Sequence, residues 1–150
     1  MAILKIINNP VDSVESLENL CNYVTDRSKS KSYENFIGGK NLEPENAFNE
    51  MVYAQELFDK SFGRRAYHFI ISFENGEPIM PGDAYDIGYD IANTFFSDYQ
   101  LLFNVHTTQE QLHLHFALNP VSLSNGKKLH FDFILLKKLK DFIDCIVIQY

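Results

Sequence analysis

Apolar residues recur along the chain with two periods, one typical of strands and one typical of helices. Short apolar, β-branched or aromatic runs predict strands at 2–7, 66–73, 100–107 and 111–119. Apolar residues at helical spacing predict helices at 14–24, 43–62 and 82–97, and a final helix after Asp132. The predicted order is therefore β-α-α-β-α-β-β-α, with a polar loop at 26–32.

This order of elements predicts an α+β fold. Only residues 108–110 separate the last two strands, which favours an antiparallel hairpin. Helices fall between the other strands, so we expect a mainly antiparallel sheet that is covered by helices. No internal repeat, linker or low-complexity tract interrupts the 150 residues, which predicts a single domain at 1–150.

The composition predicts a soluble and acidic protein. Apolar residues make up 45% and charged residues 22% of the chain, as in ordinary globular proteins. There is no run long enough to span a bilayer and no secretory signal pattern, so we expect a cytoplasmic protein without a membrane partner. The net charge of −7 argues against indiscriminate binding to nucleic acids. Cys21 and Cys145 are expected to be buried free thiols.

Three of the five histidines, His106, His113 and His115, lie within ten residues of one another. Side chains alternate along a strand, so His113 and His115 share a face, and His106 ends the neighbouring strand of the hairpin. Three imidazoles on one face predict a divalent-metal site, with three separate surface histidines as the alternative. The aromatic neighbours of His68 favour a structural role, and His130 is expected at a cap or on the surface.

Tyr23 has the setting that best suits a nucleophile. The chain has neither a serine-nucleophile elbow nor a glycine-rich phosphate loop. Tyr23 ends the first predicted helix, just before a loop that carries Arg27, Lys29 and Lys31. These charges could hold a phosphate within reach of the tyrosine hydroxyl. The simpler interpretation is a half-buried aromatic residue at a helix end.

Three blocks of the sequence resemble the motifs of the relaxase/mobilisation nuclease family, in the MobP-type branch of the HUH endonucleases. Residues 22–26 are similar to the block in which a single tyrosine attacks DNA. Residues 68–73 are similar to the block whose serine lies near the DNA. Residues 106–108 and 113–119, followed by 126–128, are similar to the metal-binding block. The order and spacing match across nearly the whole chain.

The resemblance implies both a fold and a reaction. The fold would be an antiparallel sheet of about five strands, with helices on both faces and the strand of two histidines at its centre. The reaction would be the nicking of one DNA strand through a 5′-phosphotyrosine on Tyr23. His106, His113 and His115 would bind a divalent metal ion, Mg²⁺ or Mn²⁺. The expected DNA contacts are Ser72, Arg27, Lys29, Lys31, Lys127 and Lys128.

The resemblance also implies partners, and it includes one departure from the family pattern. The partners would be single-stranded or hairpin DNA at an origin of transfer and accessory mobilisation proteins.

Thr108 stands where the family commonly has an acid, two residues after the first histidine. This departure favours an alternative, a non-catalytic relaxase-like module that binds single-stranded or hairpin DNA. A two-histidine phosphoesterase would need a second H-x-T motif, which the sequence lacks. The domain is expected to stand alone or to begin a longer protein.

Overall fold

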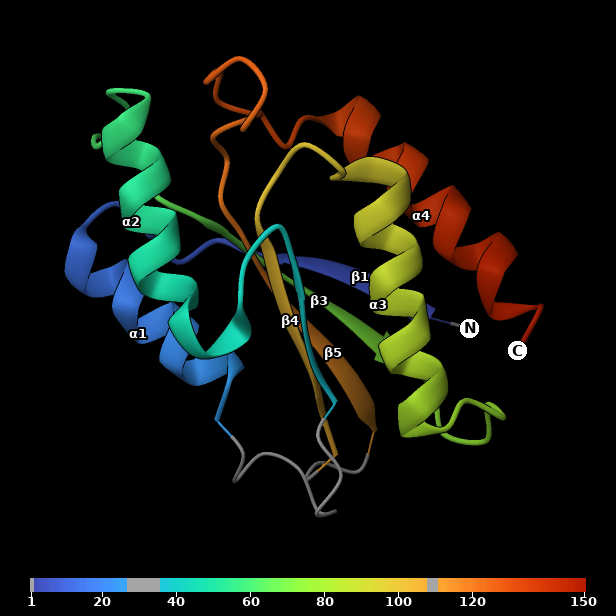
Figure 1. The fold of residues 1–150 in the computed structure, drawn as a ribbon. Helices are drawn as coiled ribbons and strands as arrows, with labels where there is room; N and C mark the ends of the chain where they lie inside the picture. The colour runs from blue at the N-terminus through green and yellow to red at the C-terminus, as the bar shows by residue number, and fades with distance from the viewer. Residues whose placement is uncertain (1, 27–35, 108–110) are drawn as a thin grey trace.

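The computed structural model describes residues 2–26, 36–107 and 111–150 (Figure 1). Within these residues the chain forms a five-stranded sheet in the order β1-β3-β5-β4-β2, in which all neighbouring strands are antiparallel. The strands are β1 Ala2–Ile7, β2 Ile37–Lys40, β3 Tyr67–Phe73, β4 Leu101–His106 and β5 Leu112–Leu118. The helices are α1 Val14–Val24, α2 Ala47–Leu57, α3 Pro81–Phe95 and α4 Phe133–Val147, with a short 3₁₀ helix at Pro44–Asn46. The predicted α+β fold with a central β5 is confirmed.

Helices cover both faces of the sheet. α1 and α2 lie on one face, and α3 and α4 lie on the other (Figure 1). Along β5, Leu114 and Phe116 point into the core under α3 and α4, whereas Ala117 packs in the core under α1. Phe69 of β3 stacks on Phe116, with ring centroids 4.4 Å apart. No described helix is both long and apolar enough to cross a membrane.

The helix predicted over 43–62 is shorter in the structure. Pro44–Asn46 forms a 3₁₀ turn, and the α-helix covers only Ala47–Leu57. Asp59, just beyond the helix, has a φ of 55°, a left-handed conformation that an α-helix cannot continue. Phe62, the last residue of the predicted helix, therefore lies outside α2, and 60% of its surface is exposed.

The cysteines are only partly as predicted. Both are free, and Cys21 is buried in the packing of α1, but Cys145 lies exposed on α4. Burial, and then the negative charge of Glu18, raise the pKa of the Cys21 thiol to about 12. This thiol is therefore protonated and unreactive at neutral pH.

The short strand β2 packs through a glycine against a phenylalanine of β4. A side chain at Gly38 would collide with the ring of Phe103. Gly88 of α3 approaches the same ring, and a Cβ at this position would lie 2.5 Å from a ring carbon. The two glycines thus allow a strand and a helix to pack closely on one phenylalanine.

We expect a Gly88→Ala variant to be less stable than the wild type by about 2 kcal/mol, because the added methyl group overpacks the Phe103 contact. This loss would outweigh the gain of up to about 1 kcal/mol that alanine brings to a helix. Gly82→Ala in the same helix is the matched control. A Cβ at Gly82 would lie 3.9 Å from its nearest neighbour. Urea unfolding measures both, and an equally stable Gly88→Ala variant would contradict the packing argument.

Candidate active site

Three imidazoles gather on the face of the sheet that α1 covers. His106 of β4 and His113 of β5 are cross-strand partners, and His115 lies two residues further along β5 on the same face. The ring centroids of His106 and His115 are 4.0 Å apart, and those of His113 and His115 are 6.2 Å apart. His106 and His115 are buried, whereas His113 is half-buried. The rings thus share a face, as strand alternation predicts.

A fourth histidine, His68 of β3, joins this cluster. Its Nε2 lies 3.2 Å from Nδ1 of His115 on the neighbouring strand, which is hydrogen-bond distance. Burial, and then the nearby His106, lower the pKa of His68 to about 4, so its ring is neutral at pH 7. His68 therefore lies on the face of the site, not in the aromatic core that its neighbours in the sequence suggest. His68 and Ser72 are four residues apart on one strand, so their side chains point to the same face of the sheet. This spacing is the sequence signal that could have placed His68 beside the other histidines.

Tyr23, on the last turn of α1, packs against the histidines. Its ring centroid lies 5.8 Å from that of His68, 5.6 Å from that of His106 and 5.4 Å from that of His115, each in an edge-on arrangement. The Tyr23 side chain is 39% exposed, so a large substrate could reach it. The fold thus brings the predicted nucleophile and predicted metal ligands together from distant parts of the sequence.

Hydrogen bonds at both ends fix α1 in this position. At its start, Ser13 and Ser16 form a capping box, in which each hydroxyl accepts from the other's backbone N–H at 3.0 Å. At its end, the Val24 carbonyl accepts from Nδ2 of Asn104 at 2.8 Å and from Nε2 of His106 at 3.2 Å. Both of these donors lie on β4, so the residue after Tyr23 is tied to a strand of the site. No spacing signal in the sequence marks Asn104 for this role.

The imidazole nitrogens are donors that divalent cations accept, and the backbone places the three histidines on one face of the sheet. Nδ1 of His113 donates to the carbonyl of Gln111 at 2.8 Å, so Nε2 is the ring nitrogen that a cation could bind. His106 is stacked on His115, and His68 contacts His115, so the rings do not point to one centre. No group of three or more His, Cys, Asp or Glu side chains in the described part of the chain is arranged to hold a metal ion. Binding would therefore require these side chains to rotate on a shared face.

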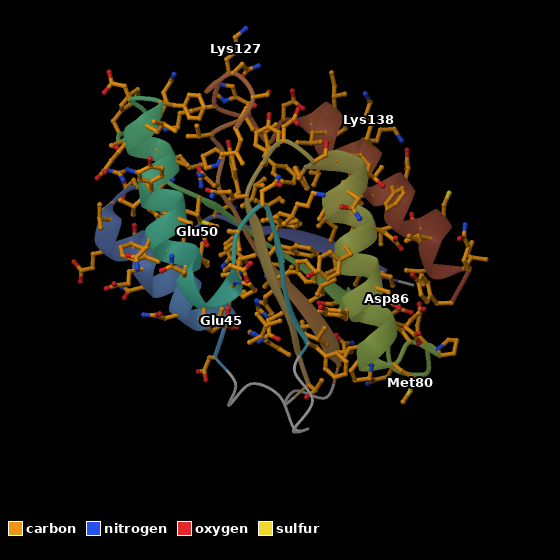
Figure 2. The ribbon with its side chains drawn as sticks, in the orientation of Figure 1. Glu45, Glu50, Met80, Asp86, Lys127 and Lys138 are labelled. Atoms are coloured by element: carbon orange, nitrogen blue, oxygen red, sulfur yellow. The ribbon has the colours of Figure 1, made fainter. Side chains whose placement is uncertain are left out.

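The predicted DNA contacts lie in different places. Ser72 of β3 is the cross-strand partner of His113 and so lies beside the histidines. Lys127 and Lys128 follow β5 in the chain, at the other end of the sheet, and Figure 2 shows Lys127 at the top of the molecule. The structure does not bring these lysines to the histidines. The remaining predicted residues lie outside the described ranges: Arg27, Lys29, Lys31 and Thr108.

The structure therefore places a tyrosine hydroxyl, one of the nucleophiles that enzymes use, beside side chains of a type that binds divalent cations. Residues 23–150 match the family described as Relaxase: MobA/VirD2-like, nuclease domain, and the chain therefore belongs to this relaxase family. The matched region includes Tyr23 and all the histidines of the cluster.

The chain is also similar to curated relaxases. It is 28% identical to Protein rlx of Staphylococcus aureus over 131 residues, which are 87% of this chain and 38% of that protein. It is 26% identical to Protein TraI of Escherichia coli over 106 residues, which are 68% of this chain and 14% of that protein. The chain thus spans well under half the length of these relatives. No solved structure matches it.

Proposed function

We propose that this domain nicks one strand of DNA at an origin of transfer, in a site- and strand-specific reaction of plasmid or transposon mobilisation. The observation that carries the proposal is the packing of Tyr23 on the rings of His68, His106 and His115. Membership of the relaxase family supports DNA as the substrate. The proposal concerns the nuclease domain, since the chain spans only part of its relatives.

Tyr23 would be the nucleophile. Its hydroxyl oxygen attacks the scissile phosphorus, the bond from phosphorus to the 3′-oxygen breaks, and the 5′-phosphate becomes attached to the tyrosine. The phenol proton passes to a base, and the departing 3′-oxygen takes up a proton to give a hydroxyl group. A phenol is a weak nucleophile until it loses its proton, so a base or a nearby cation must assist this step. The phosphotyrosyl bond keeps the energy of the phosphodiester, so the same site can reseal the strand.

The histidines would support this reaction together. His106, His113 and His115 would hold a divalent cation, Mg²⁺ or Mn²⁺, which supplies Lewis acidity to the scissile phosphate. The carbonyls of Val24 and Gln111 accept hydrogen bonds from His106 and His113, respectively. Such partners orient imidazole ligands and make them more basic.

DNA would contact the domain on both sides of the scissile phosphate. Ser72 would lie near the DNA beside the histidines. Acidic residues of α2 and α3, among them Glu50 and Asp86 in Figure 2, would lie away from it. The proposed backbone contacts are basic residues: Arg27, Lys29, Lys31, Lys127 and Lys128. We also propose accessory mobilisation proteins as partners and the cytoplasm as the location, in keeping with the family.

Covalent adduct formation tests the proposal. The domain is incubated with supercoiled plasmid that carries its cognate origin of transfer, with Mn²⁺ or Mg²⁺. The expected result is an open-circular product with protein attached to the 5′ end of the cut strand, detected after denaturation. A product without attached protein would contradict a tyrosine nucleophile.

The second candidate function is a non-catalytic module that binds single-stranded or hairpin DNA. It is favoured by Thr108, since threonine orients a histidine only weakly and can hardly help to activate the tyrosine. Tight binding of origin DNA without any adduct, at any metal concentration, would support this second function. In that case, Thr108→Asp is the variant expected to restore nicking.

A further inference from the structure

A group of cations lies at the end of the sheet remote from His113. Lys60, Arg64 and Arg65 follow α2, and Lys128 lies in the loop after β5; we call these four residues the distal basic cluster. Burial and then the positive charges of Arg65, Lys60 and Arg64 lower the pKa of Lys128. Each of the other three cations therefore lies close enough to repel Lys128.

Arg65 is the buried member of the distal basic cluster, and 9% of its surface is exposed. Its two terminal nitrogens donate to Oε1 of Gln55 at 3.2 Å and to the carbonyl of Ser61 at 2.8 Å. Its Nε is a buried atom that makes no hydrogen bond with any described residue. Both acceptors are neutral, and no carboxylate among residues 2–26, 36–107 and 111–150 forms an ion pair with this buried charge. A buried cation without a counter-ion is unfavourable, and an anion bound nearby would offset this.

Two of the other three cations, Arg64 and Lys128, also have neutral partners. Arg64 lies over the ring of Tyr67 and donates to the carbonyl of Ala66 at 3.2 Å. Lys128 lies over the ring of Phe62, at 5.0 Å from its centroid. Across the described ranges, no carboxylate forms an ion pair with a member of the cluster, although acidic residues outnumber basic residues by 20 to 13 in the chain. The cluster is thus a local positive surface on an acidic protein.

The distance from the distal basic cluster to His113 can be compared with the length of a DNA segment. His113 and Leu118 are five residues apart on β5, a distance of about 17 Å along the strand. Lys128 pairs with Val121, beyond Leu118, so the cluster lies further still from His113. About five base pairs of duplex, at 3.4 Å for each pair, span the same distance. One polyanion could therefore reach both places.

We propose that the distal basic cluster binds backbone phosphates of DNA, at a second contact about 17 Å or more from His113. This inference rests on the proposed function, because it takes the DNA held at Tyr23 as the ligand. Lysine and arginine side chains are among the groups that contact phosphate oxygens in protein–DNA complexes. Such contacts would position the DNA without reading its sequence.

The test compares two variants that each lose two positive charges. Lys60→Gln with Lys128→Gln removes half of the cluster, and Lys138→Gln with Lys140→Gln removes two exposed charges from α4. Fluorescein-labelled oligothymidylates of about four to about twenty nucleotides are the probes, because backbone contacts do not depend on sequence. Anisotropy gives the dissociation constant at several salt concentrations, without metal, so no cleavage is needed. Thermal unfolding checks that both variants fold.

We expect the cluster variant to match the wild type on the shortest probes and to bind the longest about tenfold more weakly at low salt. For those long probes, the slope of log affinity against log salt should fall by about 2, one for each lost phosphate contact. The α4 variant should keep the wild-type dependence on length. An equal loss at every probe length, or an equal loss in the α4 variant, would overturn the proposal.

Two further measurements separate this inference from its competitors. The first measurement is thermal unfolding with inorganic phosphate. If phosphate stabilises the wild type but not the cluster variant, and DNA affinity does not depend on probe length, then the cluster binds a free anion and the DNA contact is overturned. The second measurement uses Tyr23→Phe. Its DNA affinity should depend on probe length as in the wild type, because binding does not use the hydroxyl. If no adduct ever forms but the length effect is present, the nicking proposal fails and the DNA contact stands.

Discussion

A Tyr23→Phe variant should lose nicking and adduct formation completely while it folds and binds DNA like the wild type. The substitution removes one oxygen atom and keeps the ring that packs on His68, His106 and His115. Without this oxygen no phosphotyrosine can form, whereas the ring packing and the proposed metal ligands are unchanged. A plasmid nicking assay, together with denaturing electrophoresis of the labelled DNA, measures both outcomes.

Tyr53→Phe is the matched control for this experiment. Tyr53 lies on α2 with 67% of its surface exposed, away from the histidines, so its hydroxyl should be irrelevant to nicking. Undiminished nicking by Tyr23→Phe would rule out the assignment of the nucleophile. If the wild type is also inactive on its cognate origin, the departure at Thr108 becomes the explanation to test.

The second large effect is expected from His113→Ala, which should weaken Mn²⁺ binding at least tenfold and abolish detectable nicking. His113 is the best of the three proposed ligands to substitute because it is half-buried, whereas His106 and His115 are buried and stacked on each other. Isothermal titration with Mn²⁺ gives the affinity without any dependence on activity. The nicking assay then gives the catalytic effect.

His130→Ala is the control for the loss of an imidazole. His130 is exposed and precedes α4, so the variant should keep both metal affinity and nicking. Unchanged Mn²⁺ affinity in His113→Ala would remove this residue from the set of ligands. In that case, His68 would be the next candidate, because its Nε2 lies beside His115.

The alternation of side chains along a strand is the rule that predicts the histidine cluster from the sequence. Its period of two places His113 and His115 on one face, and the short hairpin brings His106 beside them. The same reasoning predicts that Leu114 and Phe116 point into the opposite core, as they do. Local periodicity suffices here because β4 and β5 are neighbours in both sequence and space.

Features that depend on distant contacts could not be predicted in this way. β2 has only four residues, two of them glycine, and it becomes a strand by pairing with β4. The packing of its Gly38 on Phe103 leaves no mark in the hydrophobic pattern. His68 reaches the site because β3 pairs with β5, a pairing between strands that are not consecutive in the chain.

The hydrogen bond from His106 to the Val24 carbonyl makes one side chain serve two parts of the site. Loss of this imidazole would remove a proposed metal ligand and, at the same time, loosen the turn of α1 that holds Tyr23. The effects of substitutions at His106 and Tyr23 on the free energy of unfolding should therefore be non-additive in a double-mutant cycle, whereas those at His113 and Tyr23 should be closer to additive. Both roles limit which residues can replace His106. Asn104 also donates to the Val24 carbonyl, so a change at position 104 could compensate and keep α1 in place.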